Sequence, residues 1–175
     1  MSIKALGAKL LAFFVKKQID KWANNPIETQ EKIFKQLIKQ AKNTTFGKEH
    51  HFEEIQSMED FSKYVPIRDY EELMPYMQRV INGEENILWK GKPLYFAKTS
   101  GTTSGIKYIP ISRESMPYHI QAARDAILLY INETKKANFV DGKMIFLQGS
   151  PILSEKNGIK TGRLSGIAAH YVPYY

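Results

Sequence analysis

Nine residues near the middle of the chain combine hydroxyl groups, two glycines and a lysine in an order suited to phosphate binding. The segment runs from Thr99 to Lys107 and is named here the hydroxyl loop. Glycine lets backbone N–H groups approach an anion closely, serine and threonine hydroxyls donate further hydrogen bonds, and the lysine ammonium pairs with phosphate oxygens. The simplest alternative is a polar surface turn, because Gly, Ser and Thr also occur in turns for local conformational reasons.

The spacing within the hydroxyl loop excludes a Walker A motif. That motif has four residues between its glycines, followed at once by lysine and a serine or threonine. Here three residues separate Gly101 from Gly105, and Ile106 stands before Lys107. Tyr108, rather than serine or threonine, follows the lysine. A nucleoside triphosphatase of that class is therefore not expected.

A second alternative is the Ser-x-x-Lys motif of penicillin-binding enzymes. Ser104 and Lys107 match it, and residues 160–162 supply a nominal Lys-Thr-Gly. The Ser-Asp-Asn element of those enzymes is absent from the sequence. Short apolar runs at 94–97 and 108–111 predict strands on both sides of the loop, whereas that serine nucleophile would belong to a helix. We therefore expect a loop between two strands.

The hydroxyl loop resembles the first signature loop of the adenylate-forming superfamily, which includes acyl-CoA synthetases and luciferases. Within it, the chain is most similar to the N-terminal part of the acyl acid amido synthetases, the group that contains plant auxin-conjugating enzymes and bacterial relatives. The resemblance covers about residues 40–170. Acyl-CoA synthetases usually carry Gly-x-Pro-Lys-Gly where this chain has residues 104–108, which favours the amido synthetase branch. The other matching segments are 46–50, 65–73, 75–83 and 96–101.

Adenylate-forming enzymes join a carboxylic acid to ATP, release pyrophosphate and leave an acyl-adenylate that an amine or thiol attacks. The resemblance implies that this chain binds ATP, with Mg²⁺ bridging the phosphate oxygens. No protein ligand for that metal is evident in the sequence. Lys107 is the expected catalytic residue, because its charge would neutralise part of the charge on the leaving group. The residues expected to cradle the β and γ phosphates are Thr99, Ser100, Gly101, Thr102, Thr103, Ser104, Gly105 and Lys107.

Arg124 is the residue that the resemblance assigns to the acyl substrate. It matches a position in the helix after the signature loop that can meet the carboxylate of the acid. A planar guanidinium suits this role because it can bond both carboxylate oxygens. The alternative is a surface arginine that pairs with the adjacent Asp125.

The function implied by the resemblance is that of a fragment of an ATP-dependent acyl acid amido synthetase, acting on a small carboxylic acid and an amino acid acceptor. The adenine-binding segment, hinge and mobile C-terminal domain of such enzymes are not detectable in these 175 residues. We therefore expect the C-terminal part of the enzyme to be missing and the chain to be inactive alone. The alternative is a non-catalytic module that keeps the loop and binds a phosphate ligand, a nucleotide or a protein partner.

The order of predicted strands and helices favours an α/β protein. The chain has 175 residues, of which 43% are hydrophobic, which is enough for a substantial core. We expect a single incomplete segment of an adenylate-forming large domain, with helices packed on a mixed β-sheet. Residues 1–48 are expected to form N-terminal helices, and residues 49–175 the α/β part. The chain has no cysteine, which excludes disulfides and thiolate metal sites. The uncharged run 10–15 is too short for a signal peptide or a membrane span, so we expect a cytoplasmic protein.

The formal net charge of +7 has several possible meanings. The lysines are scattered over several predicted helices, so we interpret them as solvated side chains and expect no nucleic-acid partner. A phosphate-rich substrate is another reason for positive charge. Lysines of the first predicted helix could also dock on a membrane surface, although packing of this helix on the domain is the preferred interpretation.

The elements that must position the loop can be partly predicted. Residues 3–24 predict an amphipathic helix, and Asn25 and Pro26 predict the start of a second helix. Adjacent histidines at 50 and 51 do not share a face, so we expect no metal there. The side chains expected on or beside the buried face of the first helix are Leu6, Leu10, Leu11, Phe14, Val15, Ile19 and Trp22.

Later segments predict a helix on each side of the loop and a strand. Residues 69–72 resemble a capping box that begins a helix, with a kink or restart at Pro75 and an end at Gly83. Ser112 is expected to cap a long helix through about residue 135, and 143–147 to form a buried strand. The glycine-containing stretches 157–158 and 162–166 are expected to be turns.

Overall fold

A computed structural model describes residues 2–99, 105–143, 145 and 147–171 of the chain. It confirms a mixed α/β fold. The α-helices are α1 Ile3–Ala23, α2 Pro26–Ala41, α3 Thr45–Glu49, α4 Met58–Tyr64, α5 Met74–Ile81, α6 Met116–Thr134 and α7 Leu164–Ala169, and η1 Asn138–Asp141 is a 3-10 helix. The strands are β1 Tyr95–Lys98, β2 Tyr108–Ile111, β3 Ser154–Lys156 and β4 Ile159–Gly162.

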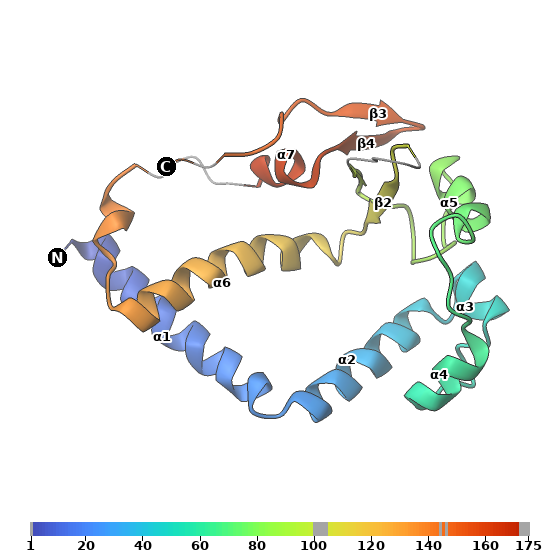
Figure 1. Ribbon diagram of the computed structural model, residues 1–175, viewed down its shortest axis with the longest axis horizontal. Coiled ribbons are helices and arrows are strands. Elements are labelled where there is room, and N and C mark those ends of the chain that lie inside the picture. Colours follow the sequence, from blue (N-terminus) through green and yellow to red (C-terminus); the bar gives the residue numbers. More distant parts are fainter. Residues whose placement is uncertain (1, 100–104, 144, 146, 172–175) are drawn as a thin grey trace.

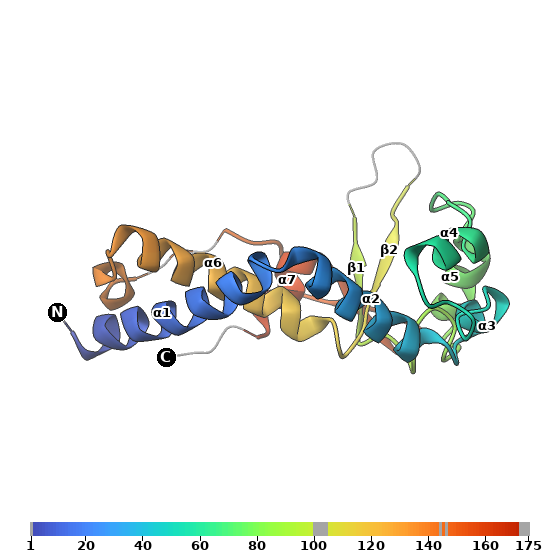
Figure 2. The ribbon, with the colours of Figure 1, turned by 90° about the horizontal axis from the view of Figure 1, so that it is seen from below.

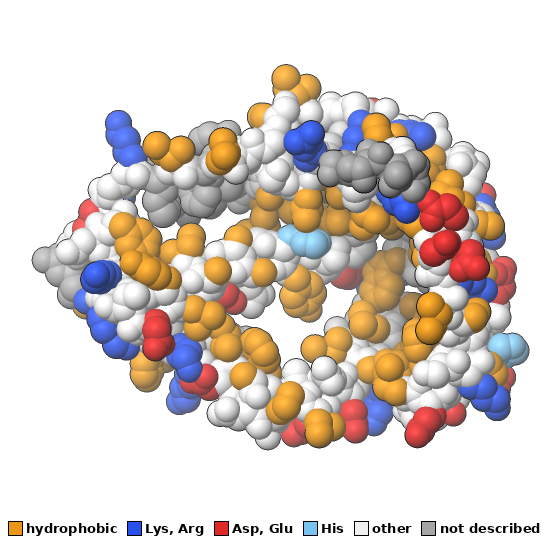
Figure 3. Space-filling model, in the orientation of Figure 1, with side chains coloured by type: hydrophobic (Ala, Val, Ile, Leu, Met, Phe, Trp, Pro, Cys, Tyr) orange, Lys and Arg blue, Asp and Glu red, His pale blue; other side chains and the backbone are white. Residues whose placement is uncertain are grey.

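The described elements form an open frame (Figure 1). α1 and the C-terminal half of α6 lie side by side at one end, and α2 leads from there to α3, α4 and α5 at the other end. The sheet and α7 lie along the remaining side. In the space-filling view, the region between α2 and α6 is open and apolar side chains surround it (Figure 3). Within the described residues, no helix has the length and hydropathy that a membrane crossing requires.

The four strands form one mixed sheet in the order β2-β1-β4-β3. β1 and β2 are antiparallel, with Tyr95 opposite Ile111 and Lys98 opposite Tyr108. β1 pairs in parallel with β4, and β4 is antiparallel to β3. The hydroxyl loop joins β1 to β2, which confirms the two strands predicted around it, and this hairpin projects from the layer of helices (Figure 2). Parallel pairing needs a long crossover, which here contains α6.

The buried face of α1 differs from the predicted one. Ala5, Ala12 and Val15 pack against α6, in a cluster that includes Leu128 and Ile131. The small alanine side chains let the two helices approach closely. Most of the large apolar side chains expected to be buried are instead exposed, namely Leu6, Leu10, Leu11, Phe14 and Trp22, each at least 46% accessible. The prediction failed because it assumed that the largest apolar side chains face the core. The contact with α6 instead buries the side of α1 that carries the small alanine side chains.

The second helix begins at Pro26 as predicted, after Asn25 at the N-cap position. Its buried residues, Ile38 and Ala41, join a cluster with Phe52 and Ile55 from the turn after α3. Aromatic side chains from α2, α3 and α4 pack around this cluster, together with Trp89. This cluster holds α2, α3 and α4 together at one end of the frame. The chain continues from there to the residues that lie beside the hydroxyl loop.

Gly47 allows a close approach between α3 and the end of α2, and this gives a testable prediction. A Cβ atom at Gly47 would lie 2.2 Å from the carbonyl oxygen of Ala41, whereas a Cβ atom at Gly7 of α1 would meet no atom of the described residues within 4 Å. Gly47→Ala should therefore lower the free energy of unfolding by about 1–3 kcal/mol. Gly7→Ala should raise it by about 0.5–1 kcal/mol, because alanine favours an exposed helix. Urea unfolding of both variants tests the pair, and equal stabilities would contradict the close approach.

Helix α4 begins with a capping box that the sequence analysis did not predict. Ser57 Oγ accepts from the Asp60 backbone N–H at 3.1 Å, and Asp60 Oδ2 accepts from the Ser57 backbone N–H at 3.0 Å. A further hydrogen bond from the Gln56 N–H, at 2.9 Å, is the main reason that the pKa of Asp60 is lowered from its usual 3.8. The Asp60 carboxylate therefore stabilises the start of α4 when it is ionised.

The lowered pKa of Asp60 predicts a pH dependence of stability. Because the folded-state pKa lies below 3.8, the contribution of Asp60 is fully present above that pH and is lost as the pH falls through the folded-state value. Asp60→Asn should therefore lower the melting temperature at pH 7 and have little effect near pH 2. Thermal unfolding at both pH values is the measurement, with Glu59→Gln in the same helical turn as the charge control. A Tm difference that persists near pH 2 would refute this assignment.

The predicted capping box at 69–72 is confirmed by reciprocal hydrogen bonds at 2.9 and 2.8 Å, and α5 starts at Met74 with Pro75 in its first turn, as the predicted restart requires. Two other predictions require correction. α6 starts at Met116, because Ser112 Oγ caps a separate turn by accepting from the Ser115 N–H at 3.0 Å. The described residues of 143–147 form no strand, and Ile145 is 95% exposed. A strand needs a partner, and no described strand lies beside this run.

The C-terminal segment contains structure that the sequence did not predict. Asn157 and Gly158, both with positive φ, form the expected turn, and it joins β3 to β4. The stretch 162–166 is not a turn, because Gly162 ends β4 and Gly166 lies in α7. A Cβ atom at Gly166 would lie 2.1 Å from the Ser150 carbonyl oxygen. This glycine therefore serves close packing of α7 rather than chain reversal.

Candidate functional site

The base of the hydroxyl loop is closed by its own backbone. The Thr99 N–H donates to the Lys107 carbonyl oxygen at 3.1 Å, which continues the β1–β2 pairing by one step. Thr99 and Gly105 are exposed, and Gly105 has a φ of +79°, a conformation that favours glycine. The predicted phosphate-binding residues Ser100, Gly101, Thr102, Thr103 and Ser104 lie outside the described residues.

Lys107 is held by two neighbouring residues that precede α5. Its Nζ lies 3.1 Å from Glu71 Oε1 and 4.8 Å from the centre of the Tyr70 ring. The Lys107 side chain is 29% exposed and the Glu71 side chain 55% exposed. The ion pair therefore lies in a partly solvated position at the edge of the loop.

Tyr70 also fixes the backbone next to Lys107. Its hydroxyl accepts from the Tyr108 N–H at 3.0 Å and donates to the Tyr108 carbonyl oxygen at 3.3 Å. Both hydrogen-bonding groups of Tyr108 that face away from β1 are thus bound by one side chain. Segment 65–73 contributed to the family resemblance, but nothing in the sequence indicated that Tyr70 and Glu71 would meet the loop.

Two further lysines lie around Tyr108. Lys156 Nζ lies 4.6 Å from the centre of the Tyr108 ring, and Lys98 Nζ donates to Ser154 Oγ of β3 at 2.8 Å. β3 therefore brings positive charge to the strand pair that carries the loop.

Arg124 does not contact the loop in the described part of the chain. It lies in the middle of α6, where its Nε and Nη2 donate to Asp125 Oδ1 at 2.9 and 2.7 Å. The Arg124 side chain is 51% exposed. This geometry matches the alternative of a surface arginine paired with its neighbour, and a role in substrate binding stays a prediction.

The described residues contain no group of three or more histidine or carboxylate side chains arranged to hold a metal ion. His50 is buried and packs structurally, since its Nδ1 lies 2.8 Å from the Phe46 carbonyl oxygen and its Nε2 2.7 Å from Arg68. Residues 99–107 contain no carboxylate. The described residues therefore offer no protein cage for magnesium, and an ion bound with a nucleotide would depend on phosphate oxygens.

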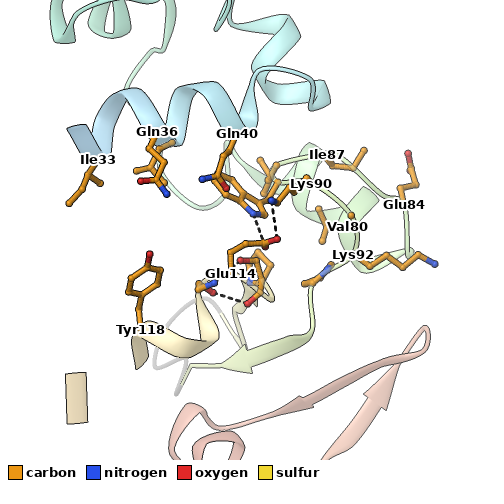
Figure 4. Close-up of a pocket in the computed structure, with 18 residues that line it drawn as sticks. Ile33, Gln36, Gln40, Val80, Glu84, Ile87, Lys90, Lys92, Glu114 and Tyr118 are labelled. Atoms are coloured by element: carbon orange, nitrogen blue, oxygen red, sulfur yellow. Dashed lines mark hydrogen bonds and ion pairs between the residues drawn. The ribbon is translucent and has the colours of Figure 1, made fainter. Parts of the chain in front are cut away.

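A cavity of about 800 Å³ lies between α2, the segment before β1 and the start of α6 (Figure 4). Glu114 lies in its wall and accepts from Trp89 Nε1 at 3.1 Å, and Lys90 Nζ lies 3.1 Å from its other oxygen. Burial alone would raise the pKa of Glu114, but its own backbone N–H, Lys90 and Trp89 outweigh this and lower it. The walls are otherwise mainly apolar and include Leu37, Val80 and Ile87.

The cavity reaches β2, because Pro110 of that strand lines it together with Ser112, which follows the strand.

Comparisons with known proteins agree with the resemblance seen in the sequence. A model of the GH3 family N-terminal domain matches residues 15–173. The indole-3-acetic acid-amido synthetase GH3.2 of Arabidopsis thaliana is 29% identical over 102 residues, which are 57% of this chain and 19% of that protein. The jasmonoyl--L-amino acid synthetase JAR4 of Nicotiana attenuata is 24% identical over 136 residues, which are 76% of this chain and 23% of that protein.

A solved structure shows the same fold. The chain superposes on the GH3.15 acyl acid amido synthetase with a TM-score of 0.75 at 19% sequence identity, covering 85% of this chain and 27% of that one. The chain thus spans between 19% and 27% of the length of these relatives. Since the family match extends over most of the sequence, the chain belongs to the GH3 family and corresponds to its N-terminal domain.

Proposed function

We propose that this chain is the N-terminal, phosphate-binding part of an ATP-dependent acyl acid amido synthetase. The observation that carries the proposal is the β1–β2 hairpin, which presents the hydroxyl loop with Lys107 held at its base by Tyr70 and Glu71. Family membership supplies the reaction class, because the relatives named above are amido synthetases.

In this reaction an oxygen of the carboxylic acid attacks the α-phosphorus of ATP. The bond to the β-phosphate oxygen breaks, pyrophosphate leaves with the negative charge, and an acyl-adenylate remains. An amine nitrogen then attacks the acyl carbon, loses a proton and displaces AMP. Residues 99–105 would donate hydrogen bonds to the β and γ phosphates, and Lys107 would stabilise the charge that develops on pyrophosphate. Magnesium, if bound with the nucleotide, would supply Lewis-acid stabilisation of the charge on the phosphates.

The substrate acid is proposed only as a class. The relatives are named for indole-3-acetic acid and for jasmonoyl conjugation. A small carboxylic acid and an amino acid acceptor are therefore the substrates that we propose. Arg124 could bind the acid without releasing Asp125, because Asp125 Oδ1 accepts from Nε and Nη2 and a guanidinium has five N–H donors. A cytoplasmic location is proposed because ATP is available there.

We also propose that the full reaction requires polypeptide beyond this segment. We divide the chain into N-terminal helices, residues 1–48, and an α/β part, residues 49–175, of a single incomplete adenylation domain. The proposal is supported by the fact that the chain covers only 19–27% of the length of these relatives. The remaining part of a complete synthetase would supply the adenine and acceptor sites.

The proposal is tested by combining MgATP binding with product formation. Isothermal titration of the 175-residue chain with MgATP should give binding that Lys107→Met weakens. Hydroxamate formation from carboxylic acids should require ATP and release pyrophosphate in a complete synthetase that carries this segment. Binding by the chain without any pyrophosphate release from the complete protein would favour the non-catalytic module. No binding of ATP or pyrophosphate would refute both the proposed function and a module that binds phosphate.

A further inference from the structure

We propose that Glu71 is a resident counter-anion for Lys107: it occupies the lysine while the phosphate site is empty, gives it up when nucleotide binds, and takes it back when pyrophosphate leaves. This inference rests on the proposed function, because it assumes that Lys107 binds phosphate. Glu71 is then a positioning residue, acting on the nucleotide through Lys107.

The geometry supports an exchange rather than a fixed structural pair. Glu71 Oε1 lies 3.1 Å from Lys107 Nζ, within range of a charge-assisted hydrogen bond. The Glu71 side chain is nevertheless 55% exposed, and no other hydrogen bond to its carboxylate is found among the described residues. An ion pair in this setting is weak, because solvent screens it. Glu71 can therefore rotate into water without leaving a buried charge unpaired.

Tyr70 keeps Lys107 in place while the lysine changes its partner. Its two hydrogen bonds to Tyr108 fix the backbone immediately after Lys107, and its ring lies 4.8 Å from Nζ. The ammonium group can therefore exchange Glu71 for a phosphate oxygen while it stays close to the same ring. Tyr70 sets the position of Lys107, and Glu71 sets which anion Lys107 contacts.

A bound polyphosphate should displace Glu71 from Lys107, and the free energy needed to break this ion pair should lower the affinity for the polyphosphate. Triphosphate and pyrophosphate carry several negative charges, whereas Glu71 carries one. Binding must break the ion pair and leave a carboxylate close to the phosphates, so Glu71 weakens phosphate binding and speeds its release. Fast release of pyrophosphate is useful in the proposed reaction because it opposes the reverse step.

The test is a double-mutant cycle with magnesium pyrophosphate as the probe, titrated into the 175-residue chain at low salt. Glu71→Gln should bind the probe about three- to fivefold more tightly than the wild type, which corresponds to the upper range of an exposed ion pair. Most of the gain should appear as slower dissociation in stopped-flow measurements. In the Lys107→Met background, Glu71→Gln should give no comparable gain.

Glu133→Gln is the matched control, since it removes the same charge at the exposed end of α6 remote from the sheet (Figure 1). A gain in affinity is informative because a folding defect at position 71 would weaken binding instead.

The outcomes separate the inference from the proposed function. If the wild type binds pyrophosphate and Glu71→Gln binds equally or more weakly, the counter-anion role is refuted while the proposed function stands. An equal gain in both backgrounds would also refute it, because simple repulsion by Glu71 would then explain the data. If neither protein binds the probe, the proposed function and the inference fail together.

Discussion

Replacing Lys107 with methionine is expected to weaken MgATP binding to the chain by about tenfold or more, because one charge-assisted hydrogen bond to phosphate contributes roughly 1.5–3 kcal/mol. In a complete synthetase, the same change should slow acyl-adenylate formation by about a hundredfold. Loss of one well-placed electrostatic donor costs about 3 kcal/mol of barrier. Methionine keeps an unbranched side chain of similar length and removes the charged ammonium group, which lies 4.8 Å from the centre of the Tyr70 ring.

The measurements are the MgATP dissociation constant of the chain and the rate of pyrophosphate release by the complete enzyme. Lys107→Arg should retain more binding than Lys107→Met, because it keeps the charge. Lys136→Met is the matched control, since Lys136 is exposed just beyond the end of α6 remote from the sheet. An unchanged dissociation constant together with unchanged turnover in Lys107→Met would remove Lys107 from the site.

Phe96→Ala is expected to have the largest effect on stability. Phe96 is fully buried in the centre of β1 and belongs to a cluster with Val80, Ile81, Ile87 and Ile159. Its ring also makes an edge contact with Tyr108, with ring centres 5.8 Å apart. Removing a buried phenylalanine ring typically costs about 3–5 kcal/mol, because apolar contact is lost and a cavity remains.

Urea unfolding of the 175-residue chain measures this effect. Phe13→Ala is the control, because Phe13 is 57% exposed on α1 and should contribute little. The loss at Phe96 should also weaken phosphate binding, since β1 leads directly into the hydroxyl loop. Equal unfolding midpoints for the two variants would show that the sheet does not depend on this cluster.

The two predictions concern different properties of the protein: Lys107→Met tests phosphate binding, and Phe96→Ala tests the stability of the sheet. The buried cluster around Phe96 holds β1 against α5, and Tyr70, which lies just before α5, bonds the backbone of β2. The position of Lys107 therefore depends both on the pairing of β1 with β2 and on the turn before α5. A change in the cluster should act through stability, whereas a change at Lys107 should act on phosphate binding in a chain that stays folded.

Local sequence signals predicted those elements that depend on near neighbours. Pro26 at the start of α2, the strands on both sides of the hydroxyl loop, and the turn at Asn157 and Gly158 were all correct. In each case the backbone preference of one or two residues, or a short apolar run, is sufficient. The order of residues in the loop also indicated the family, and the family match confirms it.

What the sequence by itself determined is therefore the α/β class, the family and the loop with its lysine. Only the tertiary structure decided which face of α1 is buried, that β1 pairs in parallel with β4, and that Tyr70 and Glu71 hold Lys107. The run at 143–147 and the large apolar residues of α1 show the reason. Burial and strand pairing depend on a partner distant in the chain, and apolar periodicity indicates that a partner is needed without specifying which one.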